Sequence, residues 1–132
     1  MSIRLPALLA GLVWLLAAQA SAHHSFSAEF DANLPISLTG LVTKIEWSNP
    51  HVWFFIDVTD ENGAVINWGW EMGSPNGLMR QGWTRNSMAI GDIVSVDGSG
   101  AKDGGNRANA RVVLLTATGD RLFAASSQGQ AP

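Results

Sequence analysis

The residues of this chain best suited to bind a metal ion are its three histidines, His23, His24 and His51. There is no cysteine, which excludes thiolate ligands and thiol redox chemistry. Imidazole nitrogen binds several transition metals, and Cu(II) forms the strongest complexes of that divalent series. We therefore identify His23, His24 and His51 as candidate copper ligands. The alternative is that all three are ordinary polar side chains without a metal role.

Two histidines stand directly after a segment with the three parts of a secretory signal peptide. Residues 1–22 contain Arg4, an apolar run and the small-x-small ending Ala20-Ser21-Ala22. The apolar run is too short to cross a bilayer, which takes roughly 20 apolar residues. We expect export to the periplasm or secretion, with no membrane span after cleavage.

The cleavage position decides which copper-binding terminus forms. Cleavage after Ala22 makes His23 the first residue, so that its free amine and imidazole can chelate one metal ion. Cleavage after Ala20 instead leaves Ser21-Ala22-His23, in which a free amine, two deprotonated amides and an imidazole bind Cu(II). Both sites satisfy the small-x-small rule. Both termini are therefore kept as predictions.

A second candidate site is aromatic. Trp53 and Phe55 alternate with Phe54 and Ile56 in a segment of strand-like pattern, so the two pairs lie on opposite faces. Trp47 precedes the turn that leads into this strand. Exposed aromatic surface is typical of a binding site, and Trp47, Trp53 and Phe55 are candidate residues for binding a protein or a small ligand.

Other chemistry finds little support in the sequence. Removal of residues 1–22 takes one of eight basic and none of 11 acidic residues, which leaves a formal charge of −4. An acidic chain is a poor partner for nucleic acid. The carboxylates of Glu46, Asp57 and Glu71 are not shown by spacing to converge, and Arg107 is expected to solvate a loop. No catalytic residues are identified, and we expect no enzyme activity.

Alternating apolar residues indicate a mostly β domain. The expected strands are 36–47 with a bulge near Thr43-Lys44, 51–59, 64–71, 93–97 and 110–117, followed by a short run at 121–124. An Asn62-Gly63 turn closes the first hairpin, with positive φ angles at both residues. Ser74 and Pro75 begin a helix at about 75–81. A glycine-rich loop is expected at 98–108.

This order of elements predicts a small five-stranded OB-like barrel with one short helix between its third and fourth strands. A bent, bulged first strand fits, because it must belong to both sides of the barrel. An open β-sandwich or unclosed sheet is the alternative. The expected organisation is a signal peptide (1–22), an extended arm (23–35), the barrel (36–125) and a disordered tail (126–132).

The chain also resembles a bacterial family of small exported proteins of unknown function. The shared motifs are the following: His23-His24-Ser25-Phe26, Glu29-Phe30-Asp31, Leu38-Thr39-Gly40, Glu46-Trp47-Ser48-Asn49-Pro50-His51, Glu71-Met72-Gly73-Ser74-Pro75, Arg80-Gln81-Gly82-Trp83 and Gly91-Asp92. The resemblance implies export and a β-rich domain, but no activity and no catalytic residues. The sequence as a whole predicts a non-catalytic binding module for a metal ion such as copper. The alternative is an aromatic face that binds another ligand.

Overall fold

The computed structural model describes residues 26–125, in which six strands and the short helix α2 follow one another. The elements are β1 (Phe30–Glu46), β2 (Trp53–Thr59), β3 (Val65–Glu71), α2 (Pro75–Arg80), β4 (Ile93–Ala101), β5 (Arg107–Leu115) and β6 (Asp120–Phe123). The predicted signal peptide and tail lie outside the described residues. Within residues 26–125, no helix is long and apolar enough to cross a membrane.

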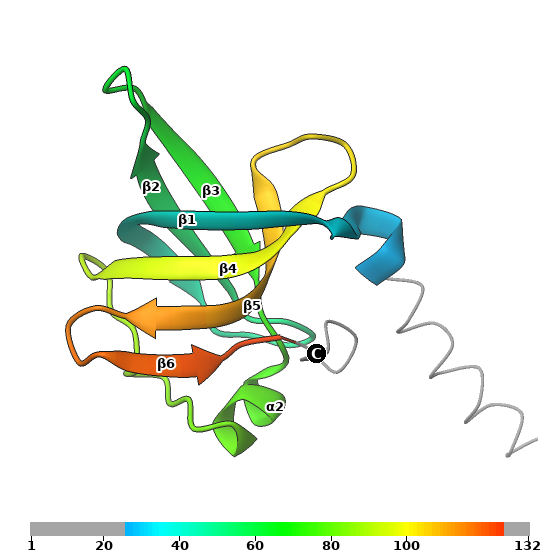
Figure 1. Cartoon of the computed structure of the whole chain (residues 1–132). Helices are drawn as coiled ribbons and strands as arrows, with labels where there is room; N and C mark the ends of the chain where they lie inside the picture. Colours follow the sequence, from blue (N-terminus) through cyan, green and yellow to red (C-terminus); the bar gives the residue numbers. More distant parts are fainter. Residues whose placement is uncertain (1–25, 126–132) are drawn as a thin grey trace, which may run out of the picture.

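Five strands close into a ring of hydrogen-bonded pairs. The sheet order is β3-β2-β1-β4-β5-β6, and β3 also pairs with β5. The β3–β5 contact is parallel and joins Gly69 to Arg107, Trp70 to Ala108 and Glu71 to Asn109. Together with α2 between β3 and β4, this confirms the mostly β, OB-like architecture (Figure 1). The short β6 lies beside β5, outside the ring.

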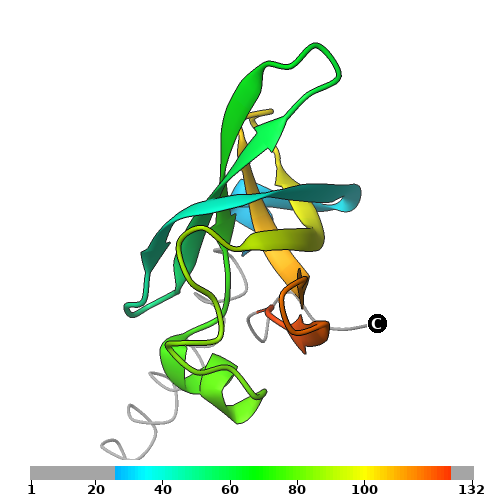
Figure 2. The ribbon, with the colours of Figure 1, turned by 90° about the vertical axis from the view of Figure 1, so that its left-hand side faces the viewer.

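The long strand β1 belongs to two sides of the ring, as the sequence predicts. Its first part pairs with β4 and its last part with β2, and Leu41 has a partner in each. The register with β2 shifts between Val42 and Lys44, so the predicted bulge is confirmed. A bulge bends and twists a strand, which lets β1 pass from one side to the other (Figure 2).

The core fills the inside of the ring. Val52, Phe54 and Ile56 are completely buried, and Val58 is partly buried against them. Phe54 stacks on Trp70 of β3, with ring centroids 6.4 Å apart. The predicted inward face of β2 is therefore correct, and its other residues point outward because side chains alternate along a strand.

Two expectations about strand limits are wrong. β1 begins at Phe30, so the second half of the expected arm is strand, and residues 26–29 are helical. The glycine-rich loop is shorter than expected, since β4 continues to Ala101 and β5 starts at Arg107. At Gly98 the strands approach so closely that a Cβ would lie 1.9 Å from the Asn109 carbonyl oxygen. Glycine here permits close strand contact and does not mark a loop.

The local capping and turn predictions hold in most details. Ser74 Oγ accepts a hydrogen bond from the Gly77 backbone N–H at 3.1 Å, and Pro75 opens α2. The β2–β3 hairpin turns at Gly63, which has a φ of 79°. No other residue of the turn has a positive φ, so the expectation for Asn62 is wrong. The Asp60 carboxylate closes this turn by accepting from the Asn62 and Ala64 backbone N–H groups.

Candidate functional site

His51 is held by the backbone at the end of β3. Its Nδ1 lies 3.0 Å from the Met72 carbonyl oxygen. A carbonyl oxygen only accepts, so Nδ1 must carry the proton of this bond. The neutral ring then has its lone pair on Nε2, which is the arrangement found in metal-binding histidines. The half-buried ring is thus fixed in a tautomer suited to bind a cation.

Glu71 lies next to the residue that orients His51. It lies in β3 opposite Trp53 of β2, and its side chain points away from the core on the same face as Trp53. Its Oε1 accepts a hydrogen bond of 3.1 Å from Asn109 Nδ2. Asn109 is the one polar residue among the buried side chains of the described residues, with 3% of its surface exposed. A buried amide therefore orients the carboxylate.

Burial raises the pKa of the Glu71 carboxyl above its usual range. The charge of a protonated His51 lowers this pKa, and the Glu29 carboxylate raises it. The Asn109 hydrogen bond and the Arg107 charge lower it further. Burial is the largest of these effects, so the folded protein favours the neutral form of Glu71 more than the unfolded chain does.

Arg107 and Glu29 complete the charged surroundings of Glu71. Arg107 Nη2 lies 3.0 Å from Asp103 Oδ2, and its Nη1 lies 3.9 Å from Glu29 Oε2. Within residues 26–125, Glu71 takes part in no ion pair. Arg107 is thus engaged by two other carboxylates, and no ion pair among the described residues joins a cation to Glu71.

Of the three predicted metal ligands, one lies in the part of the chain that the structure describes. His51 is placed, whereas His23 and His24 lie outside the described residues. Among residues 26–125, no three histidine, aspartate or glutamate side chains form a group that could hold a metal ion. Any site at His51 would therefore need donors from other residues or from solvent.

Trp53 and Phe55 lie together on the outer side of β2. Their rings stack with centroids 6.4 Å apart. Both rings lie over Gly69 of β3. A Cβ added at Gly69 would lie 3.1 Å from Phe55 Cε1 and 3.6 Å from Trp53 Cζ3. The Lys44 ammonium lies 5.2 Å from the centre of the Phe55 ring. Because Gly69 has no side chain, the two rings can rest on the backbone of β3.

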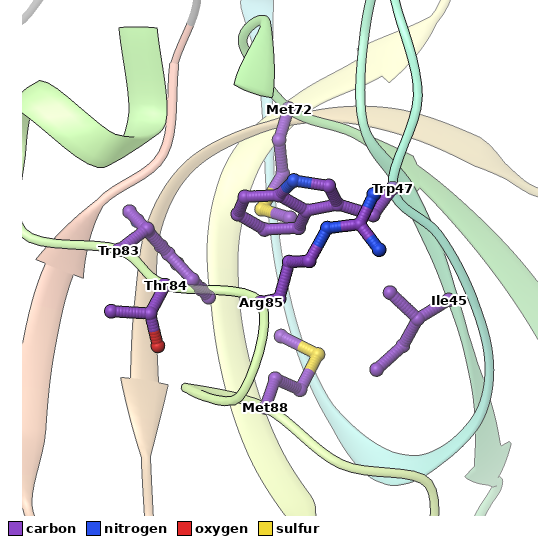
Figure 3. A pocket seen from close by; sticks show the side chains of 7 residues that line it. All are labelled: Ile45, Trp47, Met72, Trp83, Thr84, Arg85 and Met88. Carbon is purple, nitrogen blue, oxygen red and sulfur yellow. The ribbon is translucent and has the colours of Figure 1, made fainter. Parts of the chain in front are cut away.

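Trp47 does not join this aromatic pair. It packs against the core and lines a small pocket with Met72, Met88 and Trp83 (Figure 3). The cavity measures about 10 Å³, which is room for about one water molecule. Its lining is almost entirely apolar. The candidate aromatic site is therefore divided, and the Trp47 pocket is too small for an organic ligand.

Sequence reasoning missed Asn109 and underrated Glu71 and Arg107. Glu71 and Asn109 are 38 residues apart and meet only through the parallel β3–β5 pairing. Asn109 falls one residue before the expected fifth strand. The available signal was the alternation of small residues with Arg107, Asn109 and Arg111, which shows that the strand begins earlier.

Comparison with known proteins identifies the chain's family. No curated protein matches the chain. A model of the family of unknown function DUF6152 matches residues 12–110, a span that includes His51, Glu71 and Asn109. Because the match covers most of the chain, the protein belongs to this family of unknown function.

Proposed function

We propose that this protein is an exported bacterial binding module, without catalysis of its own, that binds a metal ion such as copper. The ligands in this proposal are His51 and the histidines of the exported N-terminus, His23 and His24. Export to the periplasm or medium rests on the signal-like composition of residues 1–22. Removal of this segment at either small-x-small site leaves a terminus with nitrogen donors for Cu(II).

The observation that supports metal binding best is the fixed His51 ring. The Met72 carbonyl oxygen holds the proton on Nδ1, so Nε2 offers a lone pair without further rearrangement. The length of chain between His24 and Glu29 limits how far His24 can lie from the fold. His24 precedes Glu29 by five residues, and because residues 26–29 are helical the distance spanned is well below the roughly 18 Å of an extended chain. Glu29 is near enough to affect Glu71 electrostatically, so chain length does not prevent a shared site.

Native mass spectrometry of the exported protein, with and without Cu(II), tests this proposal. It reports the true N-terminus and the number of bound metal ions in one measurement. We expect a chain starting at His23 that binds one Cu(II). A chain that starts at Ser21 would move the terminal site to the histidine-third pattern. A chain that keeps Met1 would contradict the proposal.

Calorimetry on variants then identifies the ligands. We expect His23→Ala and His51→Ala each to weaken Cu(II) binding, whereas Thr59→Ala, at the exposed end of β2, serves as a control and leaves it unchanged. A loss confined to His23→Ala would describe a flexible terminal chelate. Equal submicromolar affinity in all variants would contradict binding through these histidines.

The aromatic pair favours a second candidate function, in which the histidines are incidental. The outer surface of strands 2 and 3 is where OB-folds commonly bind ligands, and Trp53 and Phe55 stack on that surface. The dye anilinonaphthalene sulfonate reports accessible apolar surface. We expect Trp53→Ala to reduce its fluorescence enhancement, with Trp47→Phe as the control on the other side of the sheet. Equal enhancement in both would count against this candidate.

A further inference from the structure

We propose that Glu71 is a further ligand of the metal site, so that His51 and Glu71 form the part of the site that is built by the fold. This inference rests on the proposed metal binding by His51. It adds a carboxylate oxygen to the histidine nitrogens and gives Asn109 a role as a positioning residue.

The backbone brings the two side chains together. The His51 ring is bonded to the carbonyl oxygen of Met72, which directly follows Glu71 in the chain. The Val52 side chain enters the core, so His51 and Trp53 point outward with Glu71, the strand partner of Trp53. Imidazole and carboxylate thus share the outer face of the same pair of strands.

Each of the two groups is oriented by one hydrogen bond and keeps a second atom that can bind a metal ion. The Met72 carbonyl orients His51 through Nδ1, which leaves Nε2. The Asn109 amide orients Glu71 through Oε1, and no hydrogen bond or ion pair within residues 26–125 engages Oε2. Supporting hydrogen bonds of this kind, behind the donor atoms, are a regular feature of protein metal sites.

The charge balance around Glu71 also favours a bound cation. A carboxylate removed from water is costly unless a positive charge or hydrogen bonds compensate it. Arg107 lies two residues before Asn109 on β5, but its guanidinium is bound by Asp103 and lies near Glu29. A metal ion between Glu71 Oε2 and His51 Nε2 would supply the positive charge that these residues do not give.

The donor set points to Cu(II). Imidazole nitrogen with oxygen donors suits its preferred tetragonal geometry. Two ligands from the fold leave the remaining coordination positions to water.

The experiment is a Cu(II) titration of the full exported protein, followed by calorimetry and electron paramagnetic resonance. The variants are Glu71→Gln, which keeps an oxygen for the Asn109 bond but removes the charge, and Asn109→Ala. Glu61→Gln, in the exposed β2–β3 turn, is the matched control. Thermal melts without metal establish that each variant folds.

We expect Glu71→Gln to weaken Cu(II) binding at least tenfold and to change the resonance spectrum, because an oxygen ligand is lost. Asn109→Ala should weaken binding about tenfold while the spectrum keeps the wild-type ligand pattern, since a positioning residue does not touch the metal. Glu61→Gln should match the wild type in both measurements.

Failure of this inference is distinct from failure of the proposed function. If the wild type binds Cu(II) and His51→Ala weakens it, but Glu71→Gln equals Glu61→Gln in affinity and spectrum, Glu71 is not a ligand. If Glu71→Gln weakens binding and His51→Ala does not, the pairing of the two residues is wrong. If the wild type binds no Cu(II), both proposals fail.

Discussion

The two sides of the β2–β3 pair have opposite character, and neighbouring residues show it most clearly. Met72 is 1% exposed and lines the apolar Trp47 pocket (Figure 3), whereas Glu71 points outward beside His51. The inner side is filled by aliphatic and aromatic groups. The outer side collects an imidazole, a partly buried carboxylate and a buried amide.

This difference separates stability from function. Apolar side chains packed inside the ring stabilise the fold through burial. The outer polar cluster includes a carboxylate whose burial raises its pKa, which is unfavourable for the charged form in the metal-free protein. Groups that are costly to the fold yet held by specific hydrogen bonds are typical of sites that bind a ligand. If the two sides act independently, a change on one side should leave the property of the other side unaltered.

The largest effect is expected from truncation of the inner side. Phe54→Ala should lower the free energy of unfolding by about 3–5 kcal/mol, because Phe54 is fully buried and stacks on Trp70. Chemical denaturation measures this change. A loss below about 1 kcal/mol would mean that the inner and outer faces of β2 have been reversed.

On the outer side, acid should weaken copper binding. Protons compete with Cu(II) for imidazole and amine nitrogens. We expect affinity to fall by at least about tenfold between pH 7 and pH 5, as measured by calorimetry, while circular dichroism shows that the protein stays folded. An affinity that is the same at both pH values would exclude histidine and amine ligands.

A conservative change inside the Trp47 pocket should have a smaller effect and sharpen the comparison. Met72→Leu nearly conserves volume, and we expect it to cost less than about 1.5 kcal/mol of stability. It keeps the Met72 backbone carbonyl that orients His51, so Cu(II) affinity should not change. A clear loss of affinity would show that the Met72 thioether takes part in binding.

The smallest expected effect concerns Glu71 in metal-free protein. The pKa of the Glu71 carboxyl is higher in the folded protein than in the unfolded chain. Between these two pKa values the folded state binds more protons than the unfolded state, so stability falls as pH rises. Glu71→Gln removes this cost, so the variant should be more stable than the wild type at pH 7. The difference should shrink as pH falls below the ordinary pKa of glutamate, because Glu71 is then protonated in both states. Urea unfolding with a chelator present measures it, and a variant that is less stable at pH 7 would contradict the prediction.

Several features follow from local sequence because their causes are local. The alternation along residues 52–58 sets the two faces of β2, and the phase shift at Thr43-Lys44 marks the bulge in β1. Ser74 and Pro75 begin α2 through contacts within one turn. From the order of these elements the sequence predicts the OB-like ring, and it also predicts His51 as a metal ligand, which is still to be tested.

Other features depend on pairings between distant segments, which leave no local pattern. The start of β1 at Phe30 depends on β4, and the extension of β5 to Arg107 depends on its parallel contact with β3. That contact alone brings Asn109 to Glu71. Trp47 and Trp53 are both half-buried, yet the bend of the chain packs Trp47 against the core and places Trp53 on the outer side of β2. Residue types therefore determined which chemistry is available, and only the closure of the ring decided which of those groups meet, because strand pairing joins residues that the chain itself keeps apart.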